Sequence, residues 1–288
     1  SVISESSASS GIISTPVPTE DGDLRAFYTD VANAESVTVM VYMIGSDLES
    51  EDGSATDDLL EMADAALSEN VHLVLQTGGT ETWWNDVCTD DESERFVIEN
   101  GDMTLLQSLG SMNMTDADTL SDFIRFSAES YPADRYELIL WDHGGGTMTG
   151  FGYDELYEDT SLTLSSLSTA LYNGGVQFDF IGFDACLMAT AEVAYALDPY
   201  ADYLIASEES EPGEGWAYKN WLTMLAEDPA VPTAELGKKL ADDFLEAYIF
   251  ADMPTLSVLD LRYVPELYAA LESYWGSAYT ALQSGSYG

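Results

Sequence analysis

Apolar runs rich in β-branched residues recur along the chain and alternate with segments of helical periodicity. The run at residues 37–44 is almost continuously apolar, and runs at 71–75, 136–141, 178–183 and 203–206 resemble it. Such runs suit strands that are buried on both faces of a parallel sheet. Between them, apolar residues recur at spacings of three and four, as in helices with one buried face. The order therefore predicts an α/β fold, with a mainly parallel sheet covered by helices on both sides.

Three regions are predicted along the 288 residues. Residues 1–30 begin with a polar, Ser-rich stretch and would form a disordered or extended tail. Residues 31–222 carry the alternation of strands and helices and would form the core. Residues 223–288 are mainly helical in pattern, with one further apolar run at 256–261. This smaller region would complete the core or pack on it.

The chain is strongly acidic, with 8 Lys and Arg residues against 53 Asp and Glu residues and a formal net charge of −45. Phosphate backbones and anionic lipid surfaces would be repelled, which argues against nucleic-acid and membrane-surface binding. Cationic ligands would be attracted, although solubility alone explains most of these carboxylates. The composition thus favours partners with basic residues.

The sequence contains no apolar run of about 18 residues, so no membrane span is predicted. It starts at Ser1 with a polar stretch, which suits an exported protein that has lost its signal segment, and this stretch would serve as a tether to a membrane anchor. Two distant cysteines, Cys88 and Cys186, form no disulfide framework, although a single bridge stays open. With only His72 and His143 and no Cys-x-x-Cys, structural zinc is nearly excluded.

Two residues with catalytic chemistry follow two of the predicted strands. His143 comes two residues after the run that ends at Trp141, and Cys186 comes three residues after the run that ends at Phe183. Ligands of parallel sheets bind beyond the carboxyl ends of the strands, so the two side chains can meet if their strands are neighbours. A thiolate is a nucleophile, and an imidazole beside it can take its proton and protonate a leaving amine.

Local sequence adds support to this pair. A helix is predicted directly after Cys186, and its N-terminal end would favour a negative sulfur. Three glycines at 144–146 follow His143, and glycines allow close approach of a substrate and leave amides free to hold an oxyanion. From these features alone, a core cysteine and a turn histidine remain the alternatives.

The segments around both residues resemble the His and Cys blocks of the clostripain family, which belongs to the caspase-like group of cysteine peptidases. The blocks are Trp-Asp-His-Gly-Gly-Gly at 141–146 and Phe-Asp-Ala-Cys-Leu-Met at 183–188. Segments 45–50 with 55–62, and 206–216, are also similar to this family, and all blocks come in the expected order. The resemblance implies a caspase-like, three-layer α/β/α fold and a secreted or cell-surface protein of bacterial type.

The same resemblance implies a cysteine endopeptidase that cleaves after Arg or Lys through a thioester. His143 would be the general base and acid and Cys186 the nucleophile, with no third member required. The amides of Gly144 and Cys186 would hold the oxyanion. Asp184 would bind the basic side chain, since a carboxylate binds guanidinium in a bidentate manner or ammonium as a point charge. Its alternative role is to cap the following helix.

Further carboxylates have weaker claims. Glu208, Glu209 and Glu214 would add acidity around the basic side chain, or remain solvated loop charges. The resemblance implies calcium in part of the family, but the carboxylates of residues 47–58 lack the regular spacing of a calcium loop. Asp57 and Asp58 are interpreted as helix-capping residues. No metal ligand is therefore assigned, and the dyad chemistry requires no cofactor.

The resemblance implies that several relatives mature by self-cleavage after a basic residue between the His and Cys blocks. Here no Lys or Arg lies between Arg135 and Lys219. Either the intact chain is active, or a site such as Arg95 or Arg135 is used, or another protease acts. Two other functions stay open. One is a catalytically silent binder of cationic peptides, and the other is a hydrolase of small amides or a transpeptidase with the same dyad.

Overall fold

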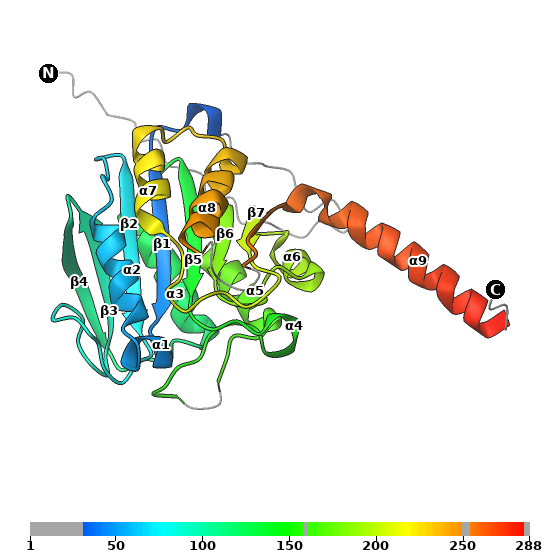
Figure 1. The fold of residues 1–288 in the computed structure, drawn as a ribbon, viewed down its shortest axis with the longest axis horizontal. Coiled ribbons are helices and arrows are strands. Elements are labelled where there is room, and N and C mark those ends of the chain that lie inside the picture. Colours follow the sequence, from blue (N-terminus) through cyan, green and yellow to red (C-terminus); the bar gives the residue numbers. More distant parts are fainter. Residues whose placement is uncertain (1–30, 158–159, 249–253, 285–288) are drawn as a thin grey trace, which may run out of the picture.

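The computed structural model of the protein describes residues 31–157, 160–248 and 254–284, and the predicted tail at 1–30 lies outside them. A single eight-stranded sheet forms the centre, in the order β4-β3-β2-β1-β5-β6-β7-β8 (Figure 1). Strands β2, β1, β5, β6 and β7 are parallel, whereas β3, β4 and β8 are antiparallel to their neighbours. The strands are β1 (Val37–Ile44), β2 (Val71–Gly78), β3 (Ser93–Glu99), β4 (Asp102–Gly110), β5 (Arg135–Trp141), β6 (Phe178–Asp184), β7 (Ala201–Ala206) and β8 (Ser257–Asp260).

Helices cover both faces of the sheet, which confirms the predicted α/β/α layers. One apolar core joins the strands to α3, α5 and α6, and the other joins them to α2, α7 and α8, which lie in front of the sheet in Figure 1. All eight residues of β1 are buried, as its continuous apolar run predicts. The helices are α1 (Ser46–Ser50), α2 (Ser54–Ala63), α3 (Ala117–Ser130), α4 (Gly146–Thr149), α5 (Leu164–Gly174), α6 (Ala191–Leu197), α7 (Tyr218–Glu227), α8 (Thr233–Ala247) and α9 (Val264–Ser284).

The structure adds elements at both ends of the sheet. Strands β3 and β4 form an antiparallel hairpin that sequence analysis missed, and Asn100 and Gly101 at its turn both have positive φ. The apolar run at 256–261 contains β8, which pairs with β7. After it, α9 extends away from the body of the molecule (Figure 1). In the part of the chain that the structure describes, no helix is both long and apolar enough to cross a membrane.

The three central strands end at one level. Met43 of β1 pairs with Trp141 of β5, and Trp141 pairs with Asp184 of β6. The segments that follow these strands therefore leave the sheet at the same edge, where α1 and α4 lie in Figure 1. This edge receives His143 and Cys186.

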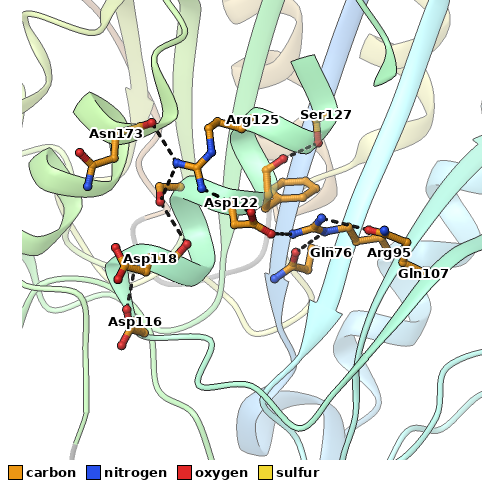
Figure 2. A network of polar contacts seen from close by, with 11 residues as sticks. Gln76, Arg95, Gln107, Asp116, Asp118, Asp122, Arg125, Ser127 and Asn173 are labelled. Carbon is orange, nitrogen blue, oxygen red and sulfur yellow. Dashed lines mark hydrogen bonds and ion pairs between the residues drawn. The ribbon is translucent and has the colours of Figure 1, made fainter. Parts of the chain in front are cut away.

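The two arginines considered for self-cleavage are buried in strands. Arg135 is fully buried in β5, where its guanidinium pairs with Asp179 and Glu137. Arg95 in β3 is 3% exposed, and its guanidinium donates to Gln76 and reaches Asp122 (Figure 2). A protease must bind an extended, accessible segment, so neither arginine is a cleavage site in the folded protein.

Candidate active site

His143 and Cys186 follow neighbouring parallel strands, as the predicted crevice requires. Trp141 at the end of β5 pairs with Asp184 at the end of β6. His143 lies two residues beyond Trp141, and Cys186 lies two residues beyond Asp184. The two backbones touch, because a methyl group added at Gly144 would overlap the Cys186 carbonyl oxygen. The glycine after His143 thus allows a contact that any larger residue would prevent.

Backbone hydrogen bonds fix the loop that follows His143. The His143 carbonyl accepts from the Gly152 N–H at 2.9 Å, and the Gly145 N–H donates to the Gly150 carbonyl at 2.8 Å. The N–H groups of Gly144 and Cys186 donate to no acceptor within residues 31–157, 160–248 and 254–284. These are the two amides that the resemblance implies for the oxyanion.

The surroundings of Cys186 differ from the sequence-based expectation. The helix expected directly after it is α6, which begins only at Ala191 and is capped by Thr190, so the predicted effect of a helix end on the sulfur is wrong. Instead, the backbone N–H of Glu211 donates to the Cys186 sulfur at 3.2 Å. The Cys186 sulfur also lies 3.8 Å from the Glu211 carbonyl oxygen, so the loop after β7 contacts the thiol through both backbone groups of Glu211.

The structure excludes a bridge between the cysteines, because both Cys88 and Cys186 are free. Cys88 is buried, and burial raises the pKa of its thiol to about 12. Cys186 is partly exposed. Nucleophilic chemistry needs an accessible thiol, so Cys186 is the candidate.

Asp47 contacts the ring of His143, and sequence analysis did not identify it as a site residue. Its Oδ1 lies 2.6 Å from His143 Nε2. Asp142, which precedes His143, points elsewhere: it is buried and accepts a hydrogen bond from the Tyr153 N–H. Burial raises the pKa of Asp142 to about 7.

Three carboxyl groups, which we call the acidic cluster, lie next to this edge: Asp58 and Asp184, which are buried, and Glu211, which is partly buried. Asp184 accepts hydrogen bonds from the Trp216 N–H at 2.9 Å and the Tyr218 hydroxyl at 2.8 Å, and is not a helix cap. Asp58 is also not a cap, since it accepts from the Trp141 indole at 2.6 Å.

Two members of the acidic cluster, Asp58 and Asp184, lie side by side beneath Gly215. A methyl group added at Gly215 would overlap Asp58 Oδ2 and lie 3.0 Å from Asp184 Oδ2. One oxygen of Glu211 accepts from the Trp216 indole at 3.1 Å. Its other oxygen is buried and has no hydrogen-bond partner among the described residues.

The acidic cluster has no positively charged side chain of the described residues to neutralise it. Burial, and then repulsion from Asp184, raises the pKa of both Asp58 and Glu211 well above the usual value. Burial also raises the pKa of Asp184. No Lys or Arg of the described segments forms an ion pair with any of the three. A positive group would therefore fit here, because it would stabilise the charged carboxylates.

The other proposed binding carboxylates lie outside the acidic cluster. Glu208, Glu209 and Glu214 are exposed in the loop after β7, and Glu208 accepts from the Ser257 hydroxyl at 2.6 Å. Glu211, in the same loop, turns inward. This loop is neither helix nor strand. Its sequence therefore has no periodicity from which the inward orientation of Glu211 could be predicted.

In the run at residues 47–58, three carboxylates are directed at different partners. Asp47 contacts His143, and Glu49 accepts from the backbone N–H groups of Thr56 and Trp84 at 2.8 and 2.6 Å. Asp58 faces the Trp141 indole. Within the described ranges, no group of three or more His, Cys, Asp or Glu side chains could hold a metal ion.

Comparison with solved structures supports the caspase-like fold. A secreted C11 cysteine protease from Bacteroides thetaiotaomicron, solved with an irreversible peptide inhibitor, superimposes with a TM-score of 0.67 at 23% identity, covering 82% of this chain and 68% of that chain. An inactive zymogen C11 protease from Parabacteroides distasonis gives a TM-score of 0.64 at 26% identity, covering 82% and 65%.

Comparison of the sequence with known proteins identifies the family. The clostripain of Hathewaya histolytica is 35% identical over 123 residues, which are 37% of this chain and 23% of that protein. The chain therefore matches less than a quarter of this relative. The model of the clostripain family matches residues 41–285, which include Asp47, His143, Asp184 and Cys186. Since this match spans most of the described fold and the whole edge just described, the chain belongs to the clostripain family.

Proposed function

We propose that the protein is a cysteine endopeptidase that cleaves peptide bonds after Arg or Lys. One observation carries this proposal: the acidic cluster adjoins the nucleophile through Glu211. The backbone N–H of Glu211 contacts the Cys186 sulfur at 3.2 Å, and its side chain belongs to the acidic cluster. Asp184 is two residues before Cys186. A basic side chain that neutralises the acidic cluster thus brings its own carbonyl group towards the thiol.

The proposed reaction follows the chemistry of a thiol and an imidazole. His143 takes the thiol proton, and the Cys186 sulfur attacks the carbonyl carbon of the basic residue. The amides of Gly144 and Cys186 stabilise the oxyanion. His143 then protonates the leaving amine, which leaves a thioester on Cys186. A water molecule, deprotonated by His143, attacks the thioester and releases the acid.

Relatives support the setting proposed for this activity. The Bacteroides thetaiotaomicron neighbour is described as secreted, and it was solved with a peptide inhibitor. We infer a secreted or cell-surface location and peptide or protein substrates with basic residues. The net charge of −45 disfavours nucleic-acid partners. The proposed steps need no cofactor, and the assay below tests calcium directly.

The proposal is tested with fluorogenic peptides that end in Arg, Lys, Asp or Leu, using wild type and Cys186→Ala, reduced, with and without calcium. We expect cleavage after Arg or Lys that disappears in the variant. If wild type binds the basic peptides without cleaving them, the protein is a silent binder. Turnover of short Arg amides alone, with longer peptides untouched, would instead indicate an amidase or transpeptidase.

The acidic cluster predicts that affinity for basic peptides rises with pH. Burial raises the pKa of Asp184 to about 7, so the unliganded acidic cluster holds protons near neutral pH. A bound cation favours the ionised carboxylates, so binding releases protons and tightens between about pH 5 and pH 8. Titration calorimetry of an Arg peptide against Cys186→Ala, in two buffers of different ionisation enthalpy, measures both effects.

A Leu peptide of the same length is the control in that titration, since it reports any contribution of His143 or of the peptide backbone. Its affinity should change little with pH. Equal pH dependence for the two peptides, or an Arg affinity that falls as pH rises, contradicts the assignment of the acidic cluster.

A further inference from the structure

We propose that Asp47 is a positioning residue for His143: it holds the ring through Nε2 and leaves Nδ1 to exchange protons with Cys186 and the leaving amine. This inference rests on the proposed function, since it requires His143 to act as the general base. It replaces a bare Cys–His pair by three side chains that act together.

Topology explains why these three residues lie at the same edge of the sheet. Strands β1, β5 and β6 are consecutive neighbours in the sheet, and their ends are level. The segments after them supply Asp47, His143 and Cys186 in that order. His143 therefore comes from the middle strand, with the carboxylate on one side and the thiol on the other. The 2.6 Å separation between Asp47 Oδ1 and His143 Nε2 is that of a short, charge-assisted hydrogen bond.

The short helix α1, which carries Asp47, is anchored on both sides. The buried carboxylate of Glu49 accepts from the Thr56 and Trp84 N–H groups, which ties α1 to α2 and to the loop after β2. The Thr80 hydroxyl donates to the Ser46 carbonyl at 2.9 Å. These contacts fix the backbone of Asp47, although its side chain is 45% exposed.

Other charged and titratable groups near the ring do not compete for it. The Asp142 carboxylate is held by the Tyr153 N–H, and the Tyr153 ring lies 6.4 Å from the His143 ring, centroid to centroid. Cys186 approaches from β6. Among the described residues, Asp47 is the side chain in hydrogen-bond contact with the imidazole.

A carboxylate in this position has two chemical effects. It accepts the Nε2 proton, so the neutral ring presents an unprotonated Nδ1 that can take the thiol proton. It also stabilises the positive charge that the ring acquires after that transfer. Both effects concern the chemical step and not the binding of substrate, so they should appear in kcat and not in KM.

The kinetic test uses Asp47→Asn, Asp47→Ala and Asp47→Glu on an Arg peptide substrate. We expect Asp47→Asn and Asp47→Ala to lower kcat by about 10- to 100-fold, a part of the usual general-base contribution, with KM nearly unchanged. Asp47→Glu should recover part of the loss, because it keeps a carboxylate. Asp52→Asn, an exposed change beyond α1, is the matched control and should behave as wild type.

A spectroscopic test reports the contact without turnover. The chain has only two histidines, so ¹⁵N-histidine labelling gives one ring signal set for His143 and one for His72. In wild type and Asp52→Asn, the Nε2–H proton of His143 should exchange slowly with water and give an observable signal. In Asp47→Ala this signal should disappear, while the His72 signals stay unchanged.

The outcomes separate the two proposals. An active wild type whose kcat is unaltered by Asp47→Ala overturns the positioning role alone. A loss that appears mainly in KM, or His143 ring signals that do not respond to Asp47→Ala, overturns it as well. A wild type that cleaves no peptide overturns the proposed function, and the positioning role falls with it.

Discussion

Replacing Asp184 with Asn is expected to lower kcat/KM for Arg peptides by about 10²- to 10³-fold, the usual effect of losing one partner of a buried charge pair. Asp184 would be such a partner for a substrate cation, since it is only 5% exposed and lies beside Asp58. Asparagine keeps an oxygen that accepts from the Trp216 N–H and the Tyr218 hydroxyl. Steady-state kinetics on Arg and Leu peptides measure the loss.

The matched control for Asp184→Asn is Glu214→Gln, which removes one charge from the exposed part of the neighbouring loop. Its effect on kcat/KM should be less than about tenfold and should shrink with added salt, because an exposed charge is screened. Thermal unfolding should show that Asp184→Asn retains the fold. If Glu214→Gln is the more damaging change, the basic side chain binds in the loop and not at the acidic cluster.

Changing Gly144 to Ala is expected to reduce kcat by about 10²-fold or more, although no reacting side chain is altered. The added methyl group overlaps the carbonyl oxygen of Cys186, which is backbone and cannot rotate away. Either the His143 loop or the Cys186 backbone must move. Each of these segments carries one of the two N–H groups proposed for the oxyanion. After the movement, the two N–H groups no longer point at the same oxygen.

Gly276→Ala is the matched control, because it makes the same change in the middle of α9 with no atom within 4 Å of the added methyl group. It should leave kcat unchanged and raise stability slightly, since Ala favours a helix over Gly. Both variants are compared by kcat and by thermal unfolding. A Gly144→Ala protein with wild-type kcat would contradict the contact between the two backbones.

The buried strands of the sheet were predictable because burial on both faces leaves a continuous apolar run, as in residues 37–44 and 136–141. The β3–β4 hairpin was missed because β4 is largely exposed. Its apolar residues are interrupted by polar ones and form no continuous apolar run. Asn100-Gly101 was a usable signal there, since this pair favours the tight turn of a hairpin.

His143 and Cys186 were predictable as candidates because strand ends concentrate functional residues at one edge of a parallel sheet. Asp47, Asp58 and Glu211 were not, since their importance depends on which partner each reaches through irregular backbone. Asp58 illustrates the difficulty: a carboxylate early in a helix normally indicates capping, yet here it is buried against the Trp141 indole. Only the three-dimensional arrangement separates these roles.

The central claim is that Cys186 is a nucleophile and that the acidic cluster binds the basic side chain of its substrate. Covalent labelling tests this claim most directly. The protein is treated with an arginyl acyloxymethyl ketone or its leucyl analogue, and the adduct is located by peptide mass spectrometry. We predict a single adduct on Cys186 from the arginyl reagent, little from the leucyl reagent, and none in Cys186→Ala. No adduct, an adduct on Cys88, or equal labelling by both reagents would contradict the claim.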